Sequence, residues 1–407
     1  MRSPDRRPAE QGSFRLGSIA VPAYGPTLVA SVGHGAILPL VALHARELGA
    51  SVSQAALMVG LVAVGQLLNS LPAGAVVARI GERRALTLTG VAEALVFLGA
   101  WRTHELWVFA VLVTLMGMAW TVFLLARQGF IIDAAPPAFR ARALSTLGGV
   151  HRIGLFVGPL VAAGIVHRWG LAAVFVLAAA TSLTAAVIVQ TMPDLSADTR
   201  ARAQSEGHAS VWSVLRDHRR RFATVGTAVA VISASRALRV SVVPLWCEHI
   251  GLSAAATSLV FGIAAAVDMT LFYPAGWVMD RFGRAWVAFP VVAAVAVGVM
   301  LLPLARSFAT VLAVSVLMAV GNGLGSGIVM TMGADTAPSV GRAQYLGGWR
   351  LAGDVGGTSA PLLFGLLVGP LSLAAACGAV GVLGLLGTGW VTWWTLDLDR
   401  SRSASAG

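Results

Sequence analysis

The chain has 407 residues, of which 57% are hydrophobic and only 12% are charged, and its mean hydropathy is +0.79. Soluble domains carry about twice that share of charged residues, so the composition excludes a disordered chain and an ordinary soluble enzyme. The two cysteines, Cys247 and Cys377, lie in separate apolar runs, which excludes a disulfide scaffold. The net charge of +11 comes from arginine alone. Because the arginines lie in short gaps between apolar runs, they form no nucleic-acid-binding stripe.

Twelve apolar segments are each long enough to cross a membrane, which takes roughly 20 residues of helix. In chain order they are residues 24–44, 53–78, 85–103, 106–130, 145–168, 171–191, 223–246, 255–279, 285–304, 308–332, 344–368 and 372–394. Turn and charge signals, such as Gly81-Glu82-Arg83 and Pro136-Pro137, separate these segments. We therefore expect an all-α integral membrane protein with twelve transmembrane helices.

The distribution of arginine predicts the orientation, because cytoplasmic loops of membrane proteins are enriched in positive charge. With the N-terminus inside, the cytoplasmic segments hold 20 arginines and the outer loops hold four. We therefore expect a multi-pass protein of the cell's inner (plasma) membrane with both termini in the cytoplasm. The predicted regions are an N-terminal tail (1–23), a first six-helix bundle (24–191), a cytoplasmic linker (192–222), a second six-helix bundle (223–394) and a C-terminal tail (395–407).

The sequence also contains an internal duplication. The segment Leu48-Gly49-Ala50-Ser51 recurs 202 residues later as Ile250-Gly251-Leu252-Ser253, and the same offset relates Asp133 to Asp335. After a deletion of three residues the offset becomes 199, and Leu147-Gly148-Gly149 matches Leu346-Gly347-Gly348. Collinear matches of this kind predict two pseudo-symmetric six-helix bundles in parallel orientation, with a site between them.

The loop after the second predicted helix, and its copy after the eighth, resemble the G-x-x-x-D-R-x-G-R-[RK] signature of the major facilitator superfamily. The second copy matches up to Arg284, whereas the first has Ala78 at the acidic position and Glu82 at an arginine position. The resemblance covers nearly the whole chain and implies a twelve-helix drug or metabolite antiporter. It assigns to a cytoplasmic gate the residues Gly74, Arg79, Gly81, Arg83, Gly276, Asp280, Arg281, Gly283 and Arg284. From their positions near helix ends, we expect Arg127, Asp133 and Asp335 to serve the same gate rather than to contact substrate.

The fifth predicted helix carries Gly154, Gly158 and Pro159, which are similar to the glycine-proline signature of the family's antiporters. Ser145 stands at the first glycine of that signature, and Ala162-Ala163 stands at its final glycine pair. The resemblance implies export and names no substrate.

Charged residues within the spans are the candidate functional groups, since each costs roughly 2.5–3.5 kcal/mol at mid-membrane and is expected to face the bundle interior. The candidates for proton coupling are Asp268, Asp354, Glu93 and His34, because a carboxyl or imidazole changes its proton affinity when its neighbours change. For Glu93 and His34, a structural contact between helices is the alternative. The candidates for the substrate cavity are Arg236, Arg239, Arg350, Arg152, His151, Gln66 and Asn322.

Two spacings leave alternatives open. Arg350 and Asp354 are four residues apart and can pair on one helix face, as either a permanent ion pair or a proton relay. Arg236 and Arg239 share a face and either neutralise Asp268 or contact a substrate anion. Because five arginines face three acids within the spans, we expect anionic or zwitterionic compounds to be preferred over cationic drugs.

These observations predict a secondary active transporter that exports a small organic compound, a drug or a metabolite, in exchange for protons by alternating access. A proton-coupled importer or facilitator is the alternative within this class, and a non-transporting membrane sensor is the alternative from another class. An enzyme is not expected, because no carboxylate cluster and no nucleophile with a nearby base is evident. The expected partners of a monomeric chain are its substrate, protons and the lipid bilayer, without a cofactor, metal or nucleic acid.

Overall fold

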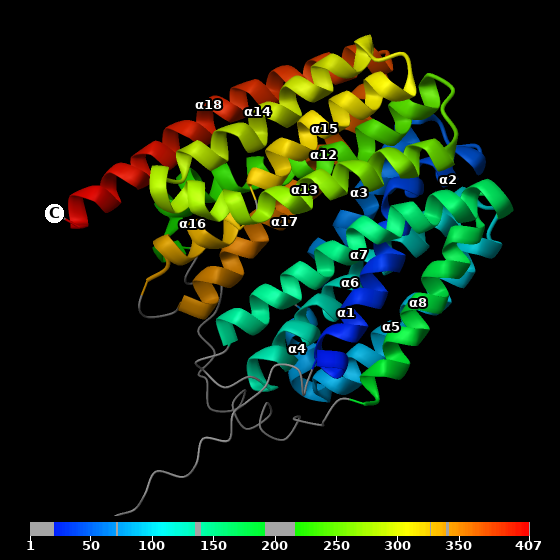
Figure 1. Ribbon diagram of the computed structural model, residues 1–407, viewed down its shortest axis with the longest axis horizontal. Helices are drawn as coiled ribbons and strands as arrows, with labels where there is room; N and C mark the ends of the chain where they lie inside the picture. Colours follow the sequence, from blue (N-terminus) through cyan, green and yellow to red (C-terminus); the bar gives the residue numbers. More distant parts are fainter. Residues whose placement is uncertain are drawn as a thin grey trace, which may run out of the picture.

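The computed structural model describes residues 20–70, 72–134, 140–191, 216–325, 327–338 and 342–406, and within these ranges it contains helices and no strands (Figure 1). Eleven helical segments of this part of the chain are long and apolar enough to cross a membrane. The twelfth, α8 (Ala173–Val189), is apolar and 17 residues long. The predicted all-α fold with twelve spans is therefore confirmed.

The first repeat begins with two interrupted spans. The first span consists of α1 (Ala20–Ile37), the short η2 (Leu38–Leu40) and α2 (Val41–Glu47), and the second consists of α3 (Val52–Asn69) and α4 (Pro72–Ile80). Proline lacks the backbone donor that a continuous helix needs, and a proline stands at both interruptions. The remaining spans of this repeat are α5 (Glu82–Arg102), α6 (Leu106–Ala134), α7 (Arg140–Trp169) and α8.

The second repeat follows the same order. Its spans are α11 (Arg219–Arg221), η4 (Phe222–Gly226) and α12 (Thr227–His249); α13 (Ala254–Phe282); α14 (Ala285–Leu301) and η5 (Leu302–Leu304); α15 (Phe308–Leu324) and α16 (Ile328–Thr336); α17 (Arg342–Val368); and α18 (Leu373–Ala406). The tenth span is broken at Gly327, the residue before α16. Its φ of +84° is a left-handed conformation that suits glycine. Helix α18 continues to Ala406, through residues that we expected to form a tail.

The backbone shows the duplication independently of the sequence match. Gly49 and Gly251 both have a left-handed φ, of 88° and 81°, and both follow a helix C-terminus. Two residues later, Ser51 and Ser253 cap the next helix by accepting a hydrogen bond from a backbone N–H, at 3.1 and 3.2 Å. The predicted repeat is thus a repeat of helix ends and caps.

The two bundles meet along two pairs of long helices, α3 with α17 and α7 with α13. Gly60 on α3 and Gly262 on α13, which are 202 residues apart, each leave room for a leucine of the other bundle, Leu362 and Leu160. A methyl group at either glycine would collide with that leucine side chain. The two interfaces therefore have a glycine at the same position of the repeat, and both need a residue without a side chain there.

The bundles are joined much more closely at one end than at the other. One apolar core, which includes Leu40 and Val242, combines residues of both bundles at the end that holds α2. Toward α4 and α16 the bundles have separate cores, and the main contacts of α4 and α16 stay within their own bundles. Figure 1 shows the same divergence. We call the end that holds α2 the Arg46 end, after a residue in the last turn of that helix. We call the end that holds α4 and α16 the linker end.

Inside the first bundle, the glycines of the antiporter-like signature hold α7 against α1. A Cβ atom at Gly154 would collide with Ser31, and one at Gly158 would collide with the carbonyl of Val32 and lie 2.7 Å from the backbone nitrogen of Ala36. These glycines allow two backbones to approach closely, as small residues do in membrane helix pairs.

We expect Gly158→Val to force α1 and α7 apart, because the colliding atoms belong to the backbone and cannot rotate away. The cost of such overpacking is about 1–3 kcal/mol, so thermal unfolding of the purified protein should begin at a lower temperature. Gly164→Val on the same helix is the matched control, since a Cβ atom there would meet nothing within 4 Å. Equal unfolding temperatures for the two variants would contradict this account of the packing.

Candidate functional site between the two bundles

Asp268 is the acidic group that connects the two bundles at their centre. It lies on α13, and its Oδ1 accepts a hydrogen bond from Nη1 of Arg152, on α7 of the first bundle, at 3.2 Å. Its Oδ2 accepts from Nδ2 of Asn322, on α15 of its own bundle, at 2.5 Å. Of the acids and cavity residues predicted from the sequence, the structure thus brings Asp268, Arg152 and Asn322 together.

Asp354 also makes a polar contact between the bundles, but not with its predicted partner. Its Oδ2 accepts a hydrogen bond from the Ser70 hydroxyl at the end of α3, at 2.7 Å. The predicted ion pair with Arg350 is wrong, since no nitrogen of Arg350 lies within ion-pair distance of this carboxylate. The Arg350 side chain is exposed, and the Ser70 hydroxyl already satisfies the carboxylate oxygen.

Arg236 and Arg239 occupy different surroundings although they share a helix face. Nη2 of Arg236 donates to the carbonyl of Gly325 at 2.5 Å, at the break between α15 and α16, while its Nε is buried without an acceptor. Arg239 lines a narrow cavity within the second bundle, together with Phe261 and Ser315. Its Nη1 and the Ser315 hydroxyl are buried without partners. Both arginines remain under-bonded.

His34 and His151 belong to an aromatic cluster of the first bundle. The His34 ring stacks on Trp120 of α6, with centroids 3.9 Å apart and planes at 4°. His151 shares a hydrogen bond of 2.7 Å with Ser31, and its ring is 5.9 Å from that of Trp120. The Nδ1 atom of His34 is buried without a partner. The cluster places two titratable rings beside the central helices.

Glu93 and Gln66 lie away from the charged centre. Glu93 is buried between α5 and α8, where Oε2 accepts a hydrogen bond from Ser182 at 3.3 Å. This position inside one bundle agrees with the alternative of a contact between helices. Gln66 lies one turn before Ser70 on α3, and its backbone carbonyl accepts from the hydroxyls of Ser70 and Thr121.

The second copy of the gate motif forms a compact network. Arg284 pairs with Asp335 of α16 through a contact of 2.9 Å between Nε and Oδ2. Asp399, near the end of α18, accepts hydrogen bonds of 3.0 Å from the backbone nitrogens of Arg284 and Ala285. Gly283, with φ of +99°, leaves the space for this carboxylate. Sequence reasoning missed Asp399, because it lies beyond the last apolar run and its register against the loop is a tertiary contact.

The first copy of the gate motif is more open. Gly81 has φ of 83° and begins α5, and Arg83 donates to the backbone carbonyl of Gln190 at 2.8 Å, so it ties α5 to α8. Arg79 is exposed, and a Cβ atom at Gly74 would lie near Leu125 alone among the described residues.

The remaining motif residues of the second copy make fewer contacts than Arg284. Asp280 is exposed, and Arg281 lies over the ring of Trp277. A Cβ atom at Gly276 would meet no described atom within 4 Å. Asp133 ends α6, with its side chain outside the described residues.

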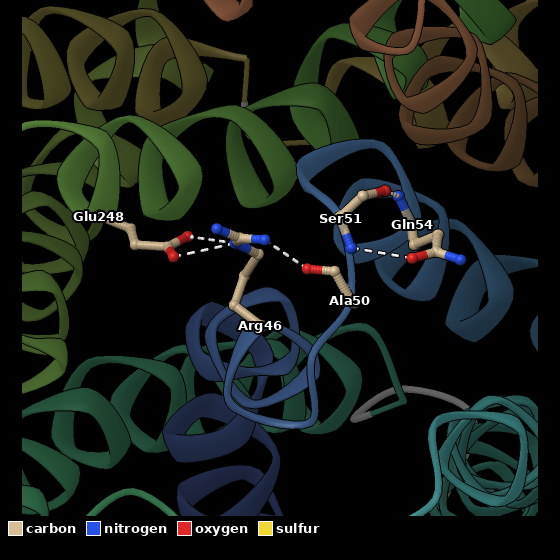
Figure 2. Close-up of polar contacts among 5 residues, drawn as sticks. All are labelled: Arg46, Ala50, Ser51, Gln54 and Glu248. Carbon is tan, nitrogen blue, oxygen red and sulfur yellow. Dashed lines mark hydrogen bonds and ion pairs between the residues drawn. The ribbon is translucent and has the colours of Figure 1, made fainter.

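An ion pair that we did not predict closes the Arg46 end. Nε of Arg46 donates to both carboxylate oxygens of Glu248, at 2.9 and 3.1 Å, and its Nη1 donates to the carbonyl of Ala50 (Figure 2). Arg46 lies in the last turn of α2 and Glu248 in the last turn of α12, so the pair joins the two bundles. The two residues are 202 positions apart and are therefore copies of each other in the repeat. That offset was the signal that could have found them.

Two six-helix repeats joined at one end, with a charged centre between them, define a carrier-type membrane protein. The family model described as "Major Facilitator Superfamily" matches residues 26–267 and 225–407. The chain belongs to this superfamily.

Two curated relatives support this assignment with shorter alignments. The multidrug resistance protein MdtG of Citrobacter koseri is 29% identical over 180 residues, which cover 43% of this chain and 44% of that protein. MdtG of Salmonella arizonae is 30% identical over 165 residues, which cover 40% and 41%. The chain therefore aligns with less than half the length of these relatives.

Solved structures share the fold at low sequence identity. A POT family transporter in complex with a thioalcohol-conjugated peptide has a TM-score of 0.77 and 11% identity, covering 94% of this chain and 96% of that one. A bacterial homolog of the human lysosomal transporter Spinster, in an inward-facing and unoccupied conformation, has a TM-score of 0.73 and 14% identity, covering 96% and 99%.

We expect Arg46→Ala to loosen the Arg46 end, because Glu248 would lose its cationic partner between the bundles. Spin labels at Glu105 and Ser372, which are exposed on opposite bundles at this end, should then report a longer distance. The exchanged pair Arg46→Glu with Glu248→Arg should restore the original distance. The new arginine would face the carbonyl of Leu252, which is the repeat equivalent of Ala50. An unchanged distance in Arg46→Ala would count against a closing role.

We expect Asp399→Ala to uncap the first turn of α14, since two backbone N–H groups lose their acceptor. Loss of a helix-capping acceptor typically costs about 1 kcal/mol. Amide hydrogen exchange at the start of α14 should therefore become faster. Asp397→Ala, two residues earlier at an exposed position, is the control and should leave exchange unchanged. Identical exchange in both variants would refute the cap.

Proposed function

We propose that the protein is a secondary active transporter that exports a small organic compound in exchange for protons by alternating access. The observation that carries the proposal is the position of Asp268, a carboxylate bonded to one residue of each bundle at their contact. Membership of the superfamily and the name of the MdtG relatives as multidrug resistance proteins support transport and export.

The proposed orientation places the linker end, both termini and residues 192–222 in the cytoplasm of a cell whose inner membrane the chain spans. The excess of arginine in these segments supports it. The proposed bundles are residues 24–191 and 223–394. In this orientation the structure corresponds to a state in which the outer side is closed by Arg46 and Glu248, and the bundles are parted toward the cytoplasm.

The proposed coupling follows from the charge on Asp268. While ionised, the carboxylate attracts the Arg152 guanidinium and holds α7 against α13. A proton on Asp268 removes this attraction, while the bond from Asn322 keeps the side chain in its own bundle. Protonation from one side and release to the other would then change how easily the bundles separate, as the exchange of protons for a substrate requires.

We expect Asp268→Asn to abolish transport driven by a pH gradient, because the amide takes up no proton, and to leave exchange of substrate across the membrane largely intact. Purified protein in liposomes should be tested with the compound that gives the largest flux in a panel of anionic, neutral and cationic compounds. Asp354→Asn is the comparison, since its amide oxygen still accepts the bond from Ser70, and its effect should be milder. Normal gradient-driven flux in Asp268→Asn would refute the coupling role.

A further inference from the structure

The charged centre has more cations than acids. Five arginines lie there, namely Arg127, Arg152, Arg236, Arg239 and Arg350, and the acids among the described residues at this site are Asp268 and Asp354. Asp268 is bonded by Arg152 and Asn322, and Asp354 by Ser70. The centre therefore lacks negative charge in this state, and the cost falls on the arginines whose guanidinium atoms are buried without an acceptor, Arg127, Arg236 and Arg239.

Arg127 is the arginine of the first bundle that most lacks a partner. Its Nε and Nη1 atoms are both buried and contact no acceptor. It lies seven residues after Trp120 on α6, which is two helical turns, so both side chains project from the same face. That face is the one on which His34 stacks. Arg127 thus extends the aromatic cluster toward the linker end.

Close backbone contacts between α3 and α6 fix the depth of Arg127. A Cβ atom at Gly65 of α3 would meet Thr114 and Met118 of α6, and one at Gly117 of α6 would meet Val62 and Gln66 of α3, so the two glycines are about level. At 1.5 Å per residue, Arg127 lies about 15 Å further toward the linker end and Ser70 about 8 Å further. Arg127 is therefore about 7 Å beyond Ser70 in depth.

The contact between α3 and α17 fixes the depth of Arg350 in the same way. Ser70 bonds to Asp354, and Arg350 lies one turn, about 6 Å, closer to the linker end on α17. Arg127 and Arg350 therefore differ in depth by no more than about 2 Å. They lie on helices that both pack against α3, from opposite bundles. Their guanidinium groups are within electrostatic range of each other.

We propose that Arg127 and Arg350 together bind an anionic group of the transported compound, a carboxylate or a similar oxyanion, with the His34–Trp120 stack beside it; this inference rests on the proposed transport function. An oxyanion accepts two hydrogen bonds from each guanidinium fork and neutralises two cations that otherwise repel each other. Arg236 and Arg239 are less suited, because one is bonded to Gly325 and the other lines a narrow cavity.

Such an anion would also act on the conformation. It would bind α6 of one bundle and α17 of the other on the side of the centre where the bundles diverge. A bound anion therefore stabilises states in which these helices are closer, and the repulsion between the two arginines favours separation when the site is empty. Substrate binding and closure of the linker end are linked by this pair of charges.

The test is a binding measurement with three probes that share one ring: naphthoate, naphthamide and naphthylmethylammonium. Purified full-length protein in lipid nanodiscs is titrated without a pH gradient, and binding is followed by tryptophan fluorescence. The variants are Arg127→Gln, Arg350→Gln and Arg239→Gln. Arg306→Gln, at an exposed position in an outer loop, controls for net charge. Arg127→Lys and Arg350→Lys keep the charge, and thermal unfolding without probe confirms that each variant is folded.

We expect the wild-type protein to bind naphthoate more tightly than the other two probes. Arg127→Gln and Arg350→Gln should each weaken naphthoate binding by about tenfold, as expected for loss of a charged hydrogen bond, with little change for naphthamide. The lysine variants should keep most of the preference. Three results would each overturn the proposal. The ammonium probe could bind most tightly, naphthoate could show no preference at millimolar concentration, or the preference could be lost in Arg239→Gln alone.

This outcome is separable from that of the transport experiment. The binding preference is measured without a gradient, so it does not depend on proton coupling through Asp268. A preference for naphthoate that depends on both arginines, in a protein that shows no gradient-driven flux, would support the anion site and refute the proposed function. Gradient-driven flux of cationic compounds, without a preference for naphthoate, would support the proposed function and refute the anion site.

Discussion

The ion pair between Arg152 and Asp268 is the interaction on which the relation of the two bundles depends. The bundles share two long helix interfaces, and in both of them a glycine leaves room for a leucine of the other bundle, so this packing carries no charge. A charge-assisted bond across α7 and α13 adds a contact whose strength changes with a single proton. In the proposed transport cycle, the apolar packing is the surface along which the bundles would move, and the ion pair is the contact that a proton would weaken.

The fold was predictable to the level of single helices, whereas the partners of the site residues were not. Apolar runs locate the twelve spans because polar side chains are costly in the hydrocarbon core of a membrane, and the 202-residue offset locates the repeat. The same runs identify Asp268 and Arg152 as buried charges. They do not say that the two face each other, because this depends on the rotation of α7 against α13. The predicted Arg350–Asp354 pair failed for a related reason, because the spacing of two residues on α17 does not show which side chain of a neighbouring helix, here Ser70, will bond to Asp354.

Polar groups at the helix ends were harder to predict than those within the membrane. Inside a span, the cost of burial makes every charge conspicuous. At the ends, charges are common, and only tertiary contacts distinguish Asp399 or Arg46 from their solvated neighbours. The two motif loops illustrate the point. Their shared glycines were found from sequence, but only the second loop has a carboxylate from α18 seated against it.

The position of Arg46 and Glu248 at equivalent places in the repeat has a historical consequence. In a dimer of two identical half-length chains, a residue beside the two-fold axis meets its own copy. An arginine there would face an arginine, and a glutamate would face a glutamate, so neither could form this contact. The ion pair requires two copies with different sequences, so it could arise only after the half-length gene had been duplicated and the two copies had diverged. It marks a step by which a symmetric ancestor became an asymmetric protein.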